Sequence, residues 1–244
     1  MEALFSYFIR IAPGLIIILS VFFLLPKKQL LAKIFLLIFA FVLMRDTMTP
    51  VGFWSFNITE STMWLRFIDS PLILFVLGIL SLGAAVSLLL VRDFRSLVRW
   101  GDARSWRTYV FGLLAGLLVA SPWIVLGFNV PLEARGGAVA IGLLPALLFM
   151  ALAGNFLEEL LFRGFLQSYF EKHMKSIRAA VVSGLIFAVA HIFLASTVTS
   201  LGWPLLVFVL VEGLACAFMY RTYGLLSAAI VHGVAIFMLA SGLL

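Results

Sequence analysis

The sequence predicts an all-α fold, a polytopic membrane bundle of about eight transmembrane helices, and two observations carry this prediction. Of the 244 residues, 64% are apolar and only 11% are charged, with a mean hydropathy of +1.18, whereas soluble domains have about 25% charged residues. The apolar residues also fall into eight stretches close to the ~20 residues that a helix needs to cross a bilayer. These stretches are residues 4–25, 30–46, 71–91, 108–128, 139–170, 179–200, 204–220 and 224–243.

The lysine and arginine residues are distributed unevenly between the two sets of connections. Residues 26–33, 92–107, 171–178 and 221–223 contain twelve of them, whereas the alternate segments contain four, namely Arg10, Arg45, Arg66 and Arg135. Because basic loops stay on the cytoplasmic side, we expect both termini to lie outside. The same bias accounts for the net charge of +6 without a nucleic-acid partner. The first stretch has Glu2 in place of a basic flank, which indicates a retained span and not a cleaved signal peptide.

Two connections have distinctive compositions. Residues 47–70 are rich in aromatic residues such as Trp54 and Trp64, which is typical of an interfacial belt; a loop that docks substrate is the alternative. Residues 92–107 alternate arginine with Leu, Val and Trp, which predicts a short amphipathic helix on anionic headgroups. We divide the chain into residues 1–137, with four spans and this basic cytoplasmic loop, and residues 138–244, with the last four spans.

Three charged residues interrupt the apolar run from 137 to 170, namely Glu158, Glu159 and Arg163. Each charge at the centre of a membrane helix costs at least ~2.5 kcal/mol, so a role for them is expected. Glu159 and Arg163 are four residues apart and can pair on one helix face. Glu158 is rotated by about 100° from Glu159, and it is left to point elsewhere.

Four other polar residues fall inside the last four stretches: Asn155, His191, Glu212 and His232. Counting from the basic residue at each inner boundary, with a rise of ~1.5 Å per residue, places Glu158 and the last three of these roughly 14–21 Å deep. Since the hydrocarbon core is about 30 Å thick, all four ionisable groups belong near its middle. We therefore expect them to converge on one cavity.

A carboxylate that faces two imidazoles in a partly dry cavity suits general acid–base catalysis on water. One Glu–His pair can remove a proton from water while the second His donates to the developing oxyanion. Cys216, the one cysteine, lies in an apolar segment, and no serine occupies a G-x-S-x-G turn, so a covalent intermediate is disfavoured. Zinc held by Glu158, His191 and His232 is the second mechanism, although the H-E-x-x-H spacing is missing. We expect no cofactor.

The motif Glu158-Glu159-x-x-x-Arg163, followed by Phe187-x-x-x-His191 and by His232 in the last span, resembles the CPBP family. These are the CAAX proteases and bacteriocin-processing enzymes, also called the ABI family of glutamic intramembrane proteases. The resemblance covers roughly residues 138–244 and implies that the catalytic core lies in the last four helices.

The resemblance also implies a role for each motif residue. Glu158 would act as the base on water together with His191, and His232 would help to stabilise the oxyanion. Glu159 would support the site with Arg163, and Phe187 would pack on the imidazole.

The sequence departs from the family pattern at one position. The last family motif is usually H-x-x-x-N, or Asp in place of Asn, but Ile236 follows His232 four residues on. Half of the expected oxyanion hole is therefore missing, and Glu212 or Asn155 could compensate. A less active or non-proteolytic member stays open.

Together these observations predict an endopeptidase that cuts a membrane-associated peptide or protein tail in or beside the bilayer. The composition indicates a multi-pass protein of a bacterial inner membrane, for which a leader or tail peptide is a more natural substrate than a prenylated protein. The alternatives are a non-catalytic immunity or scaffold protein that binds a peptide, and a proton-coupled transporter.

Overall fold

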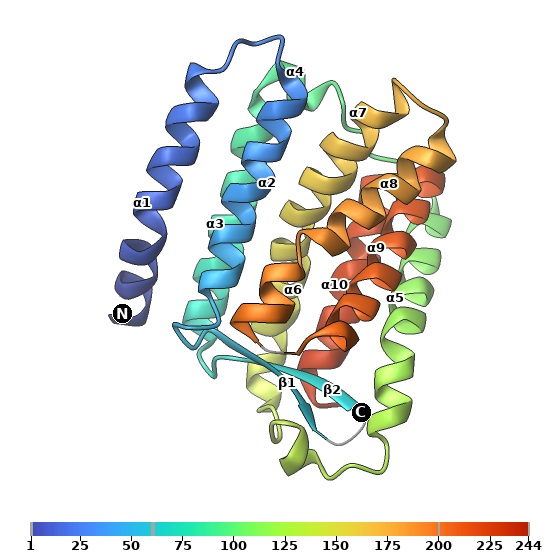
Figure 1. Cartoon of the computed structure of the whole chain (residues 1–244). Coiled ribbons are helices and arrows are strands. Elements are labelled where there is room, and N and C mark those ends of the chain that lie inside the picture. The colour runs from blue at the N-terminus through green and yellow to red at the C-terminus, as the bar shows by residue number, and fades with distance from the viewer. Residues whose placement is uncertain (1, 60–61, 200, 244) are drawn as a thin grey trace.

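The structure, a computed structural model, describes residues 2–59, 62–199 and 201–243 and consists of helices with one β-hairpin (Figure 1). Its long helices are α1 (Glu2–Leu24), α2 (Leu30–Thr47), α3 (Pro71–Leu90), α5 (Trp106–Gly127), α6 (Leu144–Glu159), α8 (Ser176–Val189), α9 (Trp203–Tyr223) and α10 (Leu225–Ser241). Each corresponds to one predicted apolar stretch, as expected if the backbone polar groups must be satisfied within each segment in hydrocarbon. The helical fold class is confirmed.

Six helical stretches of the described chain are long and apolar enough to cross a membrane. Helix α10 has only 17 residues, and α2 contains three charged residues, Lys33, Arg45 and Asp46. The count of eight spans therefore stays a prediction.

Two of the predicted stretches are not continuous α-helices. After the short 3₁₀ turns η1 (Leu132–Arg135) and η2 (Ile141–Leu143), α6 runs into a π-helix, η3 (Leu160–Gln167), and then into α7 (Ser168–Glu171). Helix α8 ends in a turn at Ala190 and His191, and a second π-helix, η4 (Leu194–Val198), follows. π-Helical turns are rare and often mark functional sites. Both lie beside the residues that the sequence singled out.

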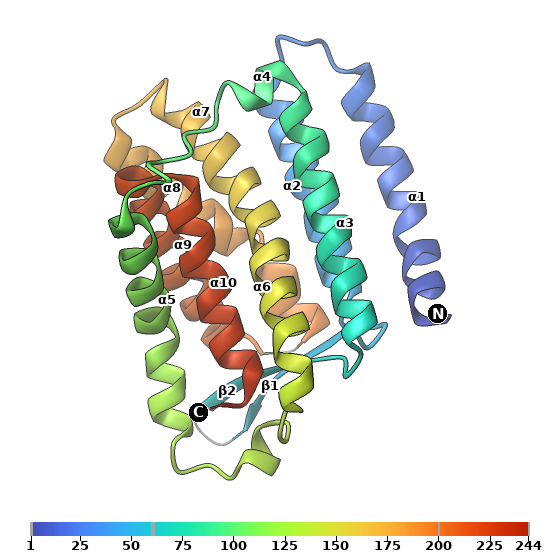
Figure 2. The same ribbon diagram turned by 180° about the vertical axis from the view of Figure 1, so that it is seen from behind.

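The helices form one bundle around α6 (Figures 1 and 2). Helix α6 packs against α3 and α10, α10 packs against α5 and α9, and α8 packs against α9. Helix α1 lies at the edge of the bundle and packs along α2. The last four long helices thus meet in the interior, with α1 to α3 on one side of them.

The aromatic connection between α2 and α3 contains two paired antiparallel strands, which form a hairpin. Strands β1 (Trp54–Thr59) and β2 (Thr62–Phe67) pair with Trp54 opposite Phe67. The belt interpretation is wrong for Phe53 and Phe56, because both side chains are buried. The hairpin covers one end of the bundle, where its inner face packs on the helices.

Between residues 92 and 105 only α4 (Arg92–Arg95) is helical, and α5 begins at Trp106, so the predicted amphipathic helix is wrong beyond its first turn. Gly101 has φ +83°, and a Cβ there would lie 1.8 Å from the carbonyl oxygen of Tyr223. Arg99 donates to the carbonyl oxygen of Tyr220 at 2.8 Å and accepts from the amide of Leu225 at 2.9 Å. The segment is therefore a strap that holds the α9–α10 turn.

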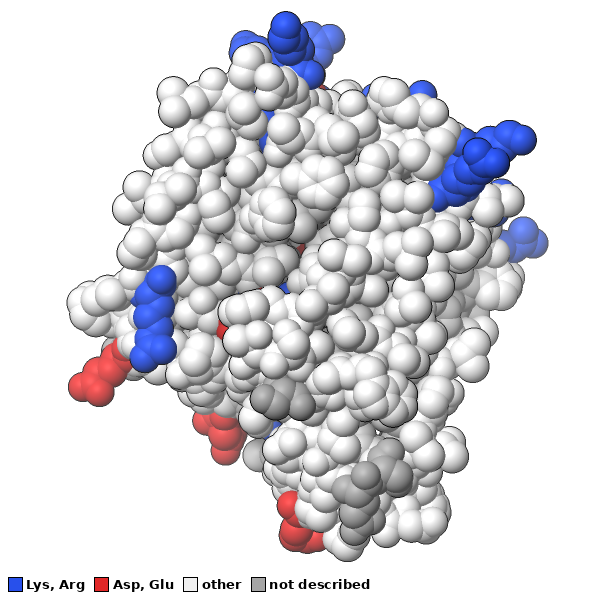
Figure 3. Space-filling view, viewed as in Figure 1, with Lys and Arg blue, Asp and Glu red and all other residues white. Residues whose placement is uncertain are grey.

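The two ends of the bundle differ in charge. The α1–α2 connection, α4 and α7 lie at one end, and the hairpin and both termini lie at the other (Figures 1 and 2). Lysine and arginine side chains gather at the first end, and much of the face between the two ends is uncharged (Figure 3). This arrangement agrees with the predicted sorting of loops, while the sidedness in a membrane stays a prediction.

Two arginines that we assigned to outer segments have other surroundings. Arg45 belongs to α2 and is buried inside the bundle. Arg66 is buried as well, and it donates to the carbonyl oxygens of Gly137, Leu239 and Ala240 at 3.1–3.4 Å. Neither is a solvated loop charge, because each guanidinium satisfies backbone or side-chain oxygens within the protein.

Candidate active site

Ionisable side chains from α6, α9, α10 and the turn after α8 meet inside the bundle. The oxygens of Glu158, on α6, face different imidazoles: Oε1 is 3.8 Å from Nε2 of His191, after α8, and Oε2 is 3.9 Å from Nε2 of His232, on α10. Oε2 of Glu212, on α9, lies 3.6 Å from the same nitrogen of His232. All four side chains are buried. The structure thus brings together the groups that the depth estimate placed at one level.

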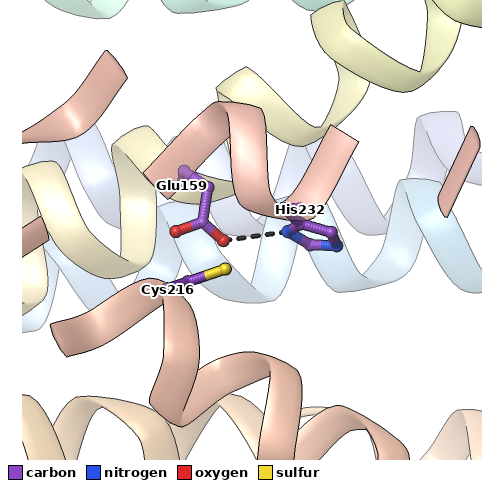
Figure 4. A group of neighbouring side chains, drawn as sticks. All are labelled: Glu159, Cys216 and His232. Carbon is purple, nitrogen blue, oxygen red and sulfur yellow. Dashed lines mark hydrogen bonds and ion pairs between the residues drawn. The ribbon is translucent and has the colours of Figure 1, made fainter. Parts of the chain in front are cut away.

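Glu159, the neighbour of Glu158 in sequence, has a different set of partners. Its Oε1 lies 3.0 Å from Nη1 of Arg163 and accepts a hydrogen bond from Nδ1 of His232 at 2.8 Å (Figure 4). Glu159 and Arg163 are both completely buried, so the predicted i,i+4 ion pair is present. Because Glu159 takes Nδ1, the other ring nitrogen of His232 is directed toward Glu158.

The π-helix η3 attaches this pair to α9. Nη2 of Arg163 donates to the carbonyl oxygen of Gly213 at 2.8 Å, and Nε2 of Gln167 donates to that of Ala217 at 3.0 Å. Donors and acceptors are each four residues apart, so one face of η3 follows one face of α9 turn by turn. These bonds fix the segment that follows both glutamates.

His191 is oriented by the end of α8. Its backbone amide donates to Ala188, which leaves the carbonyl oxygen of Phe187 for the ring, and Nδ1 lies 2.8 Å from that oxygen. Since a carbonyl group only accepts, Nδ1 carries the proton and Nε2 presents its lone pair. The break in the helix therefore sets both the direction and the tautomer of this imidazole.

Phe187 packs at the centre of the site, as the resemblance implies. Its ring centroid lies 4.5 Å from that of His191 and 5.7 Å from that of His232, and the guanidinium carbon of Arg163 lies 4.4 Å from it. A cation over an aromatic face is attractive, most of all when it is desolvated. Gly213 faces this ring, since a Cβ there would lie 2.8 Å from Cδ1 of Phe187.

Arg45 is the site residue that sequence reasoning missed. Its Nη1 lies 2.7 Å from Nε2 of His191 and 3.2 Å from Oε1 of Glu158, so it fills the gap between these two groups. Nη2 donates to the carbonyl oxygen of Ala190 at 3.0 Å, and Nε donates to Asp46 at 2.8 Å. The available signal was the adjacent Arg45-Asp46 pair at the end of an apolar run, because opposite charges together are less costly to bury than one alone.

A cavity of about 450 Å³ contains these groups. Glu158, His191, Glu212 and His232 line it, and so do Asn155 and Ile236, on a wall that is otherwise mostly apolar. The apolar wall comes largely from α1, α2, the hairpin and α3, with residues such as Tyr7, Met44, Trp54, Phe56 and Leu80. In Figure 3 small patches of acidic and basic atoms are visible in a furrow on this face. A mostly apolar cavity with a few convergent polar groups is the usual form of a binding site.

The buried groups are a poor match for a metal ion. Glu159, Cys216 and His232 have ligand atoms within 4.8 Å of one another (Figure 4), but the carboxylate is already paired with Arg163, and Nδ1 of His232 donates to it. At the zinc site considered from sequence, Nη1 of Arg45 lies between Glu158 and His191. A permanent cation at that place repels a second one.

The comparisons with known proteins concern the C-terminal part of the chain. Residues 140–238 match the family described as Type II CAAX prenyl endopeptidase Rce1-like. Neither a curated protein nor a solved structure matches the chain. The match supports a CAAX-type intramembrane endopeptidase in general, and it includes every residue of the motifs described above. Residues 140–238 are therefore similar to the CAAX prenyl endopeptidases, in agreement with the resemblance that the sequence motifs indicate.

Proposed function

We propose that this protein is an intramembrane endopeptidase of the glutamic type, which hydrolyses a peptide bond of a membrane-associated peptide or protein tail. The observation that carries the proposal is the position of Glu158, with its two oxygens 3.8 and 3.9 Å from two imidazole nitrogens in a cavity of about 450 Å³. One carboxylate between two imidazoles provides a base and a hydrogen-bond donor around a single water.

In the proposed reaction, Glu158 and His191 hold the water and Glu158 removes its proton. The oxygen of the water attacks the peptide carbonyl carbon, and the carbonyl oxygen becomes an oxyanion. His232 donates a hydrogen bond to it from Nε2, which requires the imidazolium form because Nδ1–H already donates to Glu159. Collapse of the tetrahedral intermediate breaks the C–N bond, and the proton held by Glu158 passes to the leaving amine. Glu159 and Arg163 hold His232 in place, and Phe187 packs against His191 and against the guanidinium of Arg163.

The substrate that we propose is an apolar chain end. Most of the cavity wall is apolar, which suits a segment that enters from the bilayer. The matching family acts, by its name, on prenylated CAAX proteins, and an unmodified leader or tail peptide offers the same apolar character. We further propose that the protein lies in a bacterial plasma membrane with both termini outside.

The test uses the full chain in liposomes and a pool of internally quenched peptides with apolar flanks, half of them carrying a farnesyl thioether on a C-terminal Cys-aliphatic-aliphatic-X sequence. Wild-type protein should release fluorescence from part of the pool, and Glu158→Gln and His191→Ala should abolish the release while expression and folding persist. Peptide binding without cleavage would favour a non-catalytic binding protein. Solute accumulation driven by a pH gradient would favour a transporter.

A further inference from the structure

The arginine that reaches the site from α2 has no counterpart in the motifs of the last four helices. Arg45 lies outside residues 140–238, and the bonds to Glu158 and His191 join it to residues 113 and 146 positions away. Among the described residues that line the cavity, it is the one with a permanent positive charge.

The proposed reaction needs hydrogen-bond donors at the oxyanion, and the last four helices place few of them at the cavity. An oxyanion is usually stabilised by at least two hydrogen-bond donors directed at the place where the charge develops. His232 can provide one, but Ile236, one helical turn further on α10, also lines the cavity and has no polar atom. Asn155, on α6, lines the cavity as well and is a neutral candidate for the second donor, whereas Arg45 of α2 offers a cationic one.

The guanidinium has such a donor available. Its hydrogen bonds with described residues occupy four N–H groups: Nε–H with Asp46, both hydrogens of Nη1 with Glu158 and His191, and one of Nη2 with Ala190. A guanidinium has five N–H groups, so one hydrogen of Nη2 is left on a side chain that lines the cavity.

We propose that Arg45 is a catalytic residue of this site and donates to the carbonyl oxygen of the scissile peptide as it becomes an oxyanion. This inference rests on the function proposed above. Before the attack, the negative partner of Arg45 is the carboxylate of Glu158. When Glu158 takes the proton of the water, the carboxylate becomes neutral and the electron pair of the C=O π bond moves to the carbonyl oxygen. A guanidinium within reach of both oxygens therefore keeps an anionic partner through the step.

The position of Nη1 of Arg45 requires the guanidinium to move before the reaction can begin. It fills the gap between Glu158 and His191 that the attacking water must occupy. Water and substrate therefore enter as the guanidinium turns from this gap toward the carbonyl oxygen. Asp46 orients the side chain through Nε and can remain bound during this turn, since only the Nη groups change partners.

A structural role is the competing explanation. The free carbonyl groups at the end of a helix attract cations, and Arg45 donates to Ala190 at the end of α8. A cap of this kind would stabilise the fold without changing the turnover of the folded enzyme. Turnover and stability must therefore be measured separately.

The experiment compares Arg45→Met, Arg45→Lys and Asp46→Asn with Arg10→Met, which removes an exposed arginine of α1, in liposomes with the quenched-peptide pool. We expect Arg45→Met to lower kcat about 10²–10³-fold, the effect of losing one oxyanion donor, with KM changed less than about threefold. Arg45→Lys should recover at least tenfold of that loss, because it keeps a cationic donor. Asp46→Asn should lower kcat less, and Arg10→Met should behave as wild type.

The outcomes separate this inference from the proposed function. If Glu158→Gln is inactive while folded Arg45→Met keeps kcat within about threefold of wild type, the role of Arg45 is overturned and the endopeptidase stands. If Arg45→Met does not fold, the other two variants decide: a wild-type kcat in both Arg45→Lys and Asp46→Asn would also overturn the role of Arg45. If no peptide is cleaved, or if Glu158→Gln cleaves as wild type does, the proposed function falls and the role of Arg45 with it.

Discussion

The ion pair between Glu159 and Arg163 offers a sharp test of the buried electrostatics. Both side chains are fully buried, and their closest atoms are 3.0 Å apart. Glu159→Gln keeps an oxygen that can accept from His232 and Arg163 but removes the charge. The guanidinium of Arg163 then faces only neutral acceptors among the described residues, this amide oxygen and the carbonyl oxygen of Gly213, in a dry site.

The expected magnitude follows from this burial. Removing one partner of a buried pair typically costs 3–5 kcal/mol, because an uncompensated charge stays behind. Glu159→Gln and Arg163→Met should each lower the free energy of unfolding by about this amount. The double variant should lose at least ~2 kcal/mol less than the sum, because replacing a whole buried pair with neutral groups is often nearly neutral.

The assay is denaturant-induced unfolding of the purified protein in mixed micelles, followed by far-UV circular dichroism. Glu171→Gln is the matched control: its partner Arg99 lies 3.7 Å away and has a half-exposed side chain, so we expect a loss below about 1 kcal/mol. Equal losses for Glu159→Gln and Glu171→Gln, or strict additivity in the double variant, would refute the reasoning.

Three other predictions follow from single features. Gly213→Ala places a Cβ 2.8 Å from Cδ1 of Phe187, so we expect overpacking to lower the free energy of unfolding by about 1–3 kcal/mol. Peptidase activity should fall by a larger fraction than the helical content of α9, and full activity would contradict the packing. Peptide cleavage should persist after dialysis against a chelator and should not rise with added zinc, and an activity that zinc alone restores would support the metal mechanism. In inverted and right-side-out vesicles, an impermeant maleimide should label Lys28→Cys from the inner face and Glu133→Cys from the outer face, with the buried Cys216 silent; the reverse pattern would overturn the orientation.

Much of the helical architecture could be predicted because hydrocarbon leaves the backbone few choices. Apolar runs bounded by basic residues located the eight long helices, and a constant rise per residue placed Glu158, His191 and His232 at one depth. The Glu159–Arg163 pair followed from i,i+4 spacing alone. Each of these features depends on residues that are close together in the sequence, so a single sequence is enough to predict it.

The errors concern contacts between distant segments. Arg45 was counted with the outer segments because charge sorting alone was applied to it, whereas its partners Glu158 and His191 lie more than 100 residues away. The strap at 92–107 has the composition of an amphipathic helix, but the close approach of Gly101 to Tyr223 requires an open turn. Burial of Phe53 under the hairpin is likewise decided by the helices beneath it.

The two halves of the chain contribute differently to the cavity, and this difference bears on substrate choice. Glu158, His191 and His232 lie within the family-matched residues 140–238, whereas α1, α2, the hairpin and α3 supply much of the apolar wall. Chemistry constrains the first set to particular residue types, but a wall needs only shape and apolarity to bind an apolar chain. We therefore expect substitutions in the wall, such as Leu80→Trp, to change which peptides of the pool are cleaved, while kcat for those that still fit stays near wild type. Arg45 is the exception: it lies on α2, outside the family-matched residues, but its side chain contacts Glu158 and His191.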